Sequence, residues 1–154
     1  MRLWRISNHA DLSGEGGRVV GGRWHSRGRP VVYLAEHPAL ALVENIVHLE
    51  IDPDDLPDTY QLIEVDLPDD VETEELDADK LTKTNANWRT NLAFTRGLGD
   101  AWLSAGRTAL IRMPSVVLPS SINLLVNPAH ADARQARIVS TTRPPYDRRL
   151  FRGR

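Results

Sequence analysis

The chain has 154 residues, a mass of 17.3 kDa and a net charge of −2, with 41% hydrophobic and 26% charged residues. These values predict one folded domain with a single core, exclude a wholly disordered chain, and give no overall sign of a nucleic-acid binder. The lack of cysteine excludes disulfides and thiolate metal sites, and no apolar run approaches the roughly 18 residues that cross a bilayer. We therefore expect a cytoplasmic protein that does not contact a membrane.

The amino-terminal part of the sequence predicts two strands, a glycine-rich loop and one helix. Residues Arg2 to Ser7 alternate as a strand, and Leu12 to Gly22 form the glycine-rich loop. The composition of Val31 to Ala35 indicates a buried strand, which we expect to form a β-hairpin with the chain around Arg23. A helix is predicted from Pro38 to about Glu50, because proline suits a first helical turn and apolar residues recur at helical spacing after it.

The rest of the chain predicts short strands, loops and one short helix. The acidic segment from Pro68 to Asp79 is expected to be a solvated loop or a frayed helical turn. A helix is predicted over Ala101 to Ala105, begun by Gly99 or Asp100 and stopped by glycine. Residues 144–154 are expected to form a loosely packed tail, in which Tyr146, Leu150 and Phe151 can dock. The predicted extended segments are Tyr60 to Leu67, Thr108 to Met113, Val116 to Leu118 and Ile122 to Val126.

Five or more strands with only two or three helices predict a single α+β domain over residues 1–154, with mixed or antiparallel sheets. The glycine-rich loop lacks the G-x-G-x-x-G spacing after a strand, so a dinucleotide-binding Rossmann fold is excluded. The sequence also has no P-loop and no G-x-S-x-G motif. Its five histidines show no metal-ligand spacing, so we expect no metal site.

Charge is unevenly distributed along the chain. Residues Glu50 to Asp79 include fourteen acidic residues and no basic one, whereas Asp132 to Arg154 include seven arginines and two aspartates. Arginine makes up 17 of the 19 basic residues, which is typical either of phosphate or carboxylate recognition or of genomic base composition. We favour composition, because the arginines are scattered rather than grouped with aromatic residues. The basic tail leaves open a nucleic-acid binder or ribonuclease, which the acidic segment and a pI near 6.2 oppose.

A set of polar residues in the predicted hairpin and first helix could converge. Arg23 precedes the strand that contains Tyr33, and Glu44 lies at the border of the apolar face of the helix. Each also has an ordinary structural interpretation: an exposed helix glutamate that contacts His48, a surface arginine in an ion pair, and a core tyrosine. Ser115 has the ordinary interpretation of a turn hydroxyl that bonds its own backbone.

Four stretches of the sequence carry a family resemblance: GGRWHSRGRPVVYLAEHPALALVE, GDAWL, RMPSVVLPSSINLLVNPAH and YDRRLF. Together, in order over nearly the whole chain, they resemble the RES domain, a family named for an arginine, a glutamate and a serine. The resemblance implies a toxin of a bacterial toxin–antitoxin pair, with a fold similar to the ADP-ribosyltransferase class typified by diphtheria toxin. It further implies that NAD+ is consumed as the substrate, with no other cofactor. The sequence departs from many relatives at Ala131, where they carry proline, and this leaves the site residues unaffected.

By this resemblance, Arg23, Glu44 and Ser115 are the three name-giving residues, and Tyr33 is the family's tyrosine. Breaking the nicotinamide–ribose bond builds positive charge on the sugar, so we expect Glu44 to stabilise that cation and to accept hydrogen bonds from the ribose hydroxyls. Arg23 is expected to bind the pyrophosphate with its fork of donors. Tyr33 would stack on the nicotinamide ring, and Ser115 would orient Glu44 or the ribose.

Trp24, beside Arg23, and Arg5, as a second phosphate contact, complete the predicted substrate site. The resemblance also implies an antitoxin partner with a helix-turn-helix DNA-binding part, whose carboxy-terminal segment covers the site, so that this chain itself need not bind nucleic acid. It leaves open whether the ADP-ribose passes to water, to phosphate or to a protein. A non-catalytic interaction module that kept the fold is a further alternative.

Overall fold

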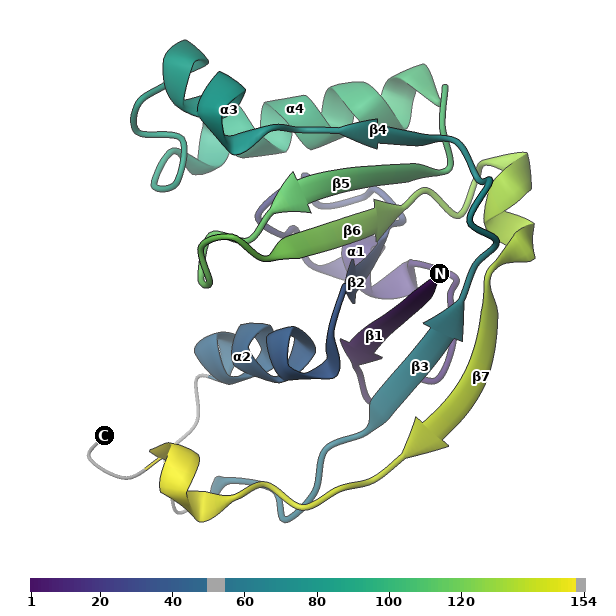
Figure 1. Cartoon of the computed structure of the whole chain (residues 1–154), viewed down its shortest axis with the longest axis vertical. Helices are drawn as coiled ribbons and strands as arrows, with labels where there is room; N and C mark the ends of the chain where they lie inside the picture. Colours follow the sequence, from purple (N-terminus) through teal and green to yellow (C-terminus); the bar gives the residue numbers. More distant parts are fainter. Residues whose placement is uncertain (50–54, 152–154) are drawn as a thin grey trace.

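The computed structural model describes residues 1–49 and 55–151. The described residues form one mixed sheet in the strand order β4-β5-β6-β2-β1-β3-β7 (Figure 1). Neighbouring strands are antiparallel except for β4 and β5, which are parallel. The predicted α+β domain with a mixed sheet is thus confirmed. The strands are β1 Arg2–Ile6, β2 Val32–Ala35, β3 Leu62–Asp66, β4 Thr73–Glu75, β5 Leu110–Pro114, β6 Ile122–Val126 and β7 Arg137–Thr142.

The helices of the described residues pack at different places along the sheet. Figure 1 shows α3 and α4 beside β4 and β5, whereas α2 lies against β1 and β2. Leu40 and Ala41 of α2 are buried against Ala35 of β2, with Trp4 and Ile6 of β1 beside them. The α-helices are α1 Glu15–Val19, α2 Pro38–His48, α3 Ala78–Thr84 and α4 Leu92–Ala105, and two 3-10 helices span Ala131–Gln135 and Arg148–Phe151. None of the helices in the described ranges is long and apolar enough to cross a membrane.

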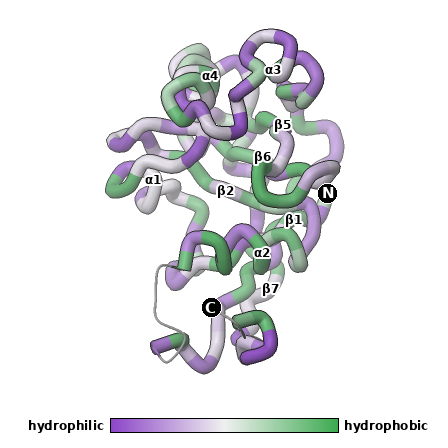
Figure 2. The backbone as a smooth tube through the Cα atoms, turned by 90° about the vertical axis from the view of Figure 1, so that its left-hand side faces the viewer, coloured by the Kyte–Doolittle hydropathy of each residue, from purple (hydrophilic) through white to green (hydrophobic). Residues whose placement is uncertain are grey.

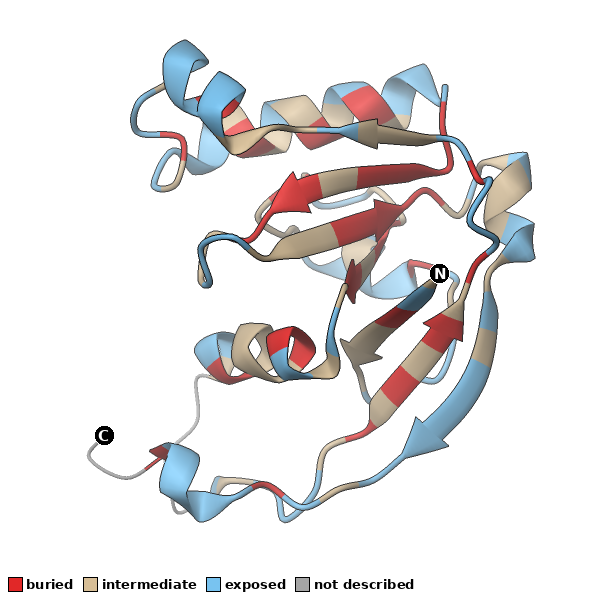
Figure 3. Ribbon diagram, viewed as in Figure 1, coloured by how far each residue is buried: buried red, intermediate tan, exposed pale blue. Residues whose placement is uncertain are grey.

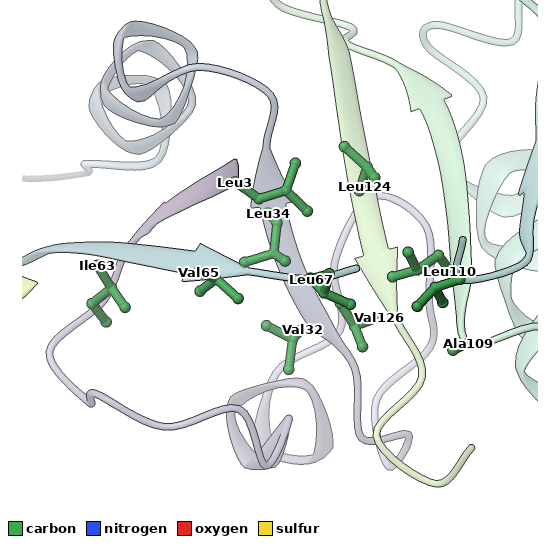
Figure 4. Packing of buried hydrophobic residues seen from close by; sticks show 11 residues of the cluster. Leu3, Val32, Leu34, Ile63, Val65, Leu67, Ala109, Leu110, Leu124 and Val126 are labelled. Carbon is green, nitrogen blue, oxygen red and sulfur yellow. The ribbon is translucent and has the colours of Figure 1, made fainter. Parts of the chain in front are cut away.

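Strand β2 separates two hydrophobic clusters, because alternate residues of a strand point to opposite faces of the sheet. On one face, Val32 and Leu34 pack with β1, β3 and β6, as Figure 4 shows. On the other face lies a cluster formed by the loop before β2, by α4 and by strands β5 and β6. The buried segments of these strands stand out in Figure 3, and Figure 2 shows their hydrophobic character. Tyr33 lies on this second face, next to the loop that carries Arg23.

Helix α4 is much longer than the sequence predicts. It begins at Leu92, where the Asn91 side chain accepts a hydrogen bond from the backbone N–H of Phe94, and not at Gly99 or Asp100. Glycine inside a sequence pattern is typical of a helix end. Here glycine is required at position 99 for a different reason, because a Cβ atom there would lie 1.7 Å from the carbonyl oxygen of Trp24. The helix therefore approaches the Arg23 loop more closely than any larger residue allows.

Several other sequence predictions are corrected. The predicted β-hairpin is wrong, because residues 21–30 form no strand and β2 pairs with β1 and β6. The glycine-rich loop contains the short helix α1, and Val116 to Leu118 form no strand. The acidic segment contains β4 and the start of α3. Helix α2 is confirmed and ends at His48; its predicted end, Glu50, lies outside the described residues.

The carboxy-terminal region is better packed than predicted. Strand β7, which the sequence analysis missed, pairs with β3 at the edge of the sheet. Tyr146 and Phe151 are each only 8% exposed and pack against Ile46 of α2, whereas Leu150 is exposed. The Tyr146 hydroxyl also donates a hydrogen bond to Oδ1 of Asn45 at 2.5 Å. The predicted loose tail is therefore docked on α2 as far as Phe151; residues 152–154 lie outside the described part of the chain.

Candidate active site

Glu44 is held by two hydrogen bonds on the inner side of α2. The helix begins at Pro38, where His37 Nδ1 accepts a hydrogen bond from the backbone N–H of Ala39. With its apolar side packed on β1 and β2, the helix places Glu44 within hydrogen-bond distance of the turn after β5 and of β6. Its Oε1 atom accepts hydrogen bonds from Ser115 Oγ at 2.7 Å and from Asn123 Nδ2 at 2.6 Å. Glu44 is therefore part of a polar cluster and not an ordinary exposed helix residue.

Ser115 connects this cluster to the turn that follows β5. Its hydroxyl donates to Glu44 and accepts hydrogen bonds from the backbone N–H groups of Val117 and Leu118 at 3.2 and 2.9 Å. Its own N–H donates to the carbonyl of Ser121 at 2.8 Å, and the residue is only 1% exposed. The turn hydroxyl and the orienting contact with Glu44 thus occur together. Because the turn fixes the hydroxyl, the position of the Glu44 carboxylate is fixed as well.

Tyr33 is held by the loop that contains Trp24 and His25. The carbonyl of Gly17 accepts from His25 Nε2 at 3.1 Å, so this nitrogen carries the proton and Nδ1 is an acceptor. The backbone N–H of Gly22 donates to Nδ1, which agrees with this tautomer. The Tyr33 hydroxyl therefore donates to Nδ1 at 2.8 Å and accepts from the backbone N–H of Trp24 at 3.1 Å. Burial raises the pKa of Tyr33, so the hydroxyl keeps the proton that it donates.

The stability of this loop is expected to depend on pH through His25. Burial lowers the pKa of His25 below its ordinary value of 6.5. The folded chain then keeps the ring neutral while the unfolded chain takes up a proton, so this contribution to stability is complete above pH 6.5 and declines as the pH falls below it. We expect urea denaturation to give a smaller free energy of unfolding at about pH 5.5 than at about pH 7.5. His25→Asn, which does not titrate, should reduce that difference; an unchanged difference would assign it to other groups.

Arg23 carries a polar atom that has no partner in the described structure. Its backbone carbonyl accepts a hydrogen bond from Thr95 Oγ1 at 2.8 Å, which anchors the loop to α4. Its Nη1 atom is buried and makes no hydrogen bond among the described residues. Burial is the main cause of the raised Tyr33 pKa, and the positive charge of Arg23 opposes it, so the guanidinium lies near the phenol. A buried N–H donor without an acceptor is costly, and this orphaned donor suits an anionic ligand.

A chain of contacts joins the Arg23 loop to the Glu44 cluster. Trp24 packs against Trp88 with ring centroids 6.0 Å apart. The Arg89 guanidinium lies 4.6 Å from the centre of the Trp88 ring, and its Nη1 donates to the carbonyl of Ser115 at 3.4 Å. Two neighbouring aromatic rings and one arginine thus span the space between Arg23 and Ser115. No hydrogen bond or ion pair in the described ranges joins Arg23 to Glu44 directly.

The sheet register also places Tyr33, beside the Arg23 loop, near Asn123 of the Glu44 cluster. Tyr33 lies opposite Leu125, and Ala35 lies opposite Asn123. Tyr33 and Asn123 are therefore diagonal neighbours on the same face, about 7–8 Å apart by ordinary sheet geometry. Two cavities, of about 350 and 190 Å³, lie elsewhere, next to the 3-10 helix at Ala131–Gln135 and between α3 and α4. The polar residues that the fold gathers around β2 and β6 thus lie outside both cavities, and we call them the candidate site: Arg23, His25, Tyr33, Glu44, Arg89, Ser115 and Asn123.

The sequence and the fold of the chain can be compared with known proteins. The family model described as the RES domain matches residues 2–148. The chain belongs to the RES domain family. The family resemblance carried by the four sequence motifs is therefore confirmed.

The RES chain is similar over nearly its full length to proteins named as toxins. "Toxin Res" from Pseudomonas putida is 46% identical over 98% of this chain and 100% of its own length. "Prs ADP-ribosylating toxin" from a Sphingobium species is 37% identical over 97% of this chain and 96% of its own length. A chain in the crystal structure of the M. tuberculosis MbcT-MbcA toxin-antitoxin complex is 19% identical with a TM-score of 0.75, covering 97% of this chain and 86% of that chain. The last likeness shows that the fold is shared.

Two predicted substrate contacts are placed differently from the rest of the RES site. Trp4 of β1 lies opposite Ala35, on the face that carries Tyr33, so Arg5 points to the other face. There its Nη1 donates to the carbonyl of Asp11 at 3.1 Å, and burial lowers its pKa. The structure therefore does not bring Arg5 to the group. Trp24 is only 2% exposed and packs against Trp88 as part of the core.

Three residues of the candidate site were missed in the sequence analysis: His25, Arg89 and Asn123. Asn123 had a visible signal, because it is the one polar residue in the predicted strand Ile122 to Val126. A polar residue in a buried strand needs a hydrogen-bond partner. Its partner could not be named, since Glu44 lies 79 residues away in the sequence. His25 and Arg89 each follow a tryptophan directly, and nothing else in the sequence distinguished them.

Proposed function

We propose that this RES chain is the toxin of a bacterial toxin–antitoxin pair and that it cleaves the nicotinamide–ribose bond of NAD+, by hydrolysis or phosphorolysis. The observation that carries the proposal is the Glu44 carboxylate, which is fixed by Ser115 and Asn123 on the same sheet face as Tyr33. A fixed carboxylate beside aromatic and cationic groups suits a substrate that develops positive charge near negative phosphates. NAD+ is the substrate in this proposal, and no metal or further cofactor takes part.

Glu44 is the electrostatic catalyst of the proposed reaction. As the bond to nicotinamide breaks, positive charge develops on the ribose, and the carboxylate stabilises that charge and accepts hydrogen bonds from the ribose hydroxyls. Its position needs no adjustment during the reaction, because Ser115 is itself fixed by two backbone N–H groups. Such preorganisation is worth more than a flexible charge of the same sign.

Arg23 and Tyr33 bind the two parts of NAD+ on either side of the ribose, which are the pyrophosphate and the nicotinamide. The unpartnered Nη1 of Arg23 donates to the pyrophosphate, and the planar guanidinium can offer two parallel hydrogen bonds to phosphate oxygens. Tyr33 stacks on the nicotinamide ring. The hydrogen bonds of the Tyr33 hydroxyl with His25 and with the backbone of Trp24 keep the tyrosine ring in place. Trp24 anchors the loop that carries Arg23 by packing against Trp88.

An alternative acceptor for the ADP-ribose is a protein side chain. The curated Sphingobium relative is named as an ADP-ribosylating toxin, which supports this second activity. Hydrolysis, phosphorolysis and transfer to a protein all release nicotinamide and differ only in the nucleophile that attacks the ribose. All three use the same roles for Glu44 and Arg23.

The proposed partner is an antitoxin with a helix-turn-helix DNA-binding part. The carboxy-terminal segment of this antitoxin covers the candidate site around Glu44. Its support is the similar fold of a chain in a toxin-antitoxin complex. DNA binding then belongs to the antitoxin. The arginines of the carboxy-terminal region do not favour a nucleic-acid binder, because Arg149 pairs with Asp147 at 2.6 Å and Arg143 donates to Gln61.

One experiment tests the proposal and identifies the acceptor. Purified protein is incubated with NAD+ labelled in the ADP-ribose part, with and without phosphate and with and without cell lysate, and the labelled products are separated. We expect nicotinamide release, with the label in free ADP-ribose or, when phosphate is present, in its phosphorylated form. Label on a lysate protein would establish the alternative. Intact NAD+ in every mixture would contradict both, and the Glu44→Gln protein is the matched control for contaminating activity.

A further inference from the structure

Both hydrogen bonds to Glu44 reach the same oxygen. Ser115 Oγ and Asn123 Nδ2 donate to Oε1 at 2.7 and 2.6 Å. Within residues 1–49 and 55–151, no hydrogen bond reaches Oε2 and no basic side chain forms an ion pair with the carboxylate. The two oxygens of Glu44 therefore have different surroundings. Two neutral donors hold one of them, and the other is left to a ligand.

Asn123 is held firmly in the middle of the sheet. Its backbone in β6 pairs with Ala35 of β2 on one side and with Met113 of β5 on the other. Ala35 and Met113 are both buried. The side chain leaves this strand towards α2, and because a carboxylate can only accept, the amide presents its NH2 group to Glu44. A donor carried by a central strand is a more rigid support than one on a loop.

We infer that Asn123 is a positioning residue of the reaction: together with Ser115 it fixes Oε1 of Glu44 and directs Oε2 to the ribose. The inference deepens the proposed function and rests on it. Neutral donors suit this task better than an arginine or lysine would, because they orient the carboxylate without cancelling the negative charge that the cationic ribose needs. Ser115 alone fixes a distance, whereas two donors, one from the turn after β5 and one from β6, fix the direction of the carboxylate.

Two substitutions of Asn123 separate this role from simple packing. Asn123→Ala removes the donor, and we expect kcat for nicotinamide release to fall about 10–100-fold while the dissociation constant for NAD+ changes little. Asn123→Asp keeps the size of the side chain but sets a second carboxyl against Glu44. When ionised, the introduced group repels Glu44; when protonated, it can donate a hydrogen bond to Oε1. At about pH 8, Asn123→Asp should therefore be slower than Asn123→Ala, and at about pH 5.5 it should be faster.

The measurements are kcat against pH at saturating NAD+, the NAD+ dissociation constant by calorimetry, and the thermal unfolding temperature of each variant. Asn87→Asp and Asn87→Ala, at an exposed asparagine, are the matched controls and should follow the wild-type pH profile. A pH-independent ratio between the two Asn123 variants, or wild-type kcat in Asn123→Ala, would overturn the positioning role while the proposed function stands. Wild-type protein that releases no nicotinamide would overturn the proposed function itself.

Discussion

Glu44→Gln is expected to lower the rate of nicotinamide release from NAD+ by about 10²–10³-fold, with a much smaller change in the NAD+ dissociation constant. The amide has the size of the carboxylate, and its oxygen can still accept the hydrogen bonds of Ser115 and Asn123. The substitution therefore removes the negative charge and turns the second oxygen, which accepts from the ribose hydroxyls in the proposed reaction, into an NH2 group that can only donate. In the proposed reaction that charge stabilises the ribose cation, which exists only during bond cleavage, so the loss falls on kcat. The rate is measured at saturating NAD+ by chromatography of nicotinamide, and binding by calorimetry.

Glu36→Gln is the matched control for this experiment. The Glu36 carboxylate accepts a hydrogen bond from the backbone N–H of Ile122 at 2.7 Å, so it is also a fixed acceptor near β6. Within the described residues it forms no hydrogen bond with Ser115 or Asn123. We expect this variant to keep the wild-type rate. Wild-type turnover in a correctly folded Glu44→Gln protein would remove Glu44 from the chemistry and with it the central part of the proposed function.

The elements that local sequence predicts well are those whose pattern is repeated over several residues. Helix α2 follows from the proline at its start and the apolar spacing after it, and β6 follows from a run that is apolar apart from Asn123. Strand β7 had the β-branched residues of a strand, but it lies just before the prolines of the predicted loose tail and was not assigned. Its pairing with β3 shows that those prolines lie beyond the strand and do not interrupt it.

Other elements depend on contacts that the local sequence does not contain. The acidic residues of β4 are tolerated in a strand because it lies at the sheet edge, where Glu74 pairs with Arg107 at 2.9 Å. The start of α4 was predicted too late in the chain because Gly99 resembles a helix end. Glycine is required there by the carbonyl of Trp24, which lies more than seventy residues earlier in the sequence. In both places a contact between distant segments outweighs local propensity.

The residues of the candidate site also divide into those that the sequence predicts and those whose role depends on distant contacts. The family resemblance led to Arg23, Tyr33, Glu44 and Ser115, and the structure joins Glu44 to Ser115 directly. It could not lead to Asn123 or His25, because the value of each lies in its partner: the carboxylate on α2 and the tyrosine on β2. Arg5, proposed from its place on the first predicted strand, is not brought to this group, since alternation along β1 sends that side chain to the opposite face.

Arg23→Lys is expected to weaken NAD+ binding by about 10–100-fold, which corresponds to one lost hydrogen bond of about 1.5–3 kcal/mol to a charged group. The change keeps the positive charge but replaces a planar fork of donors with a single ammonium group. The loop cannot move to compensate, because Thr95 anchors the backbone of residue 23 to α4 at 2.8 Å. The dissociation constant is measured by calorimetry, and the same loss is expected for ADP-ribose, which keeps the pyrophosphate but lacks nicotinamide.

Arg27→Lys, at an exposed arginine in the same loop, is the matched control and should bind both ligands as the wild type does. A third ligand, nicotinamide mononucleotide, makes the result specific, because it has no pyrophosphate. A general disturbance of the site would weaken its binding too, whereas the loss of a pyrophosphate contact would not. Unchanged affinity of Arg23→Lys for ADP-ribose would show that the guanidinium does not bind the phosphates. The unpartnered Nη1 would then need another acceptor, since a buried donor of this kind is stable only when a ligand or a partner protein completes its hydrogen bond.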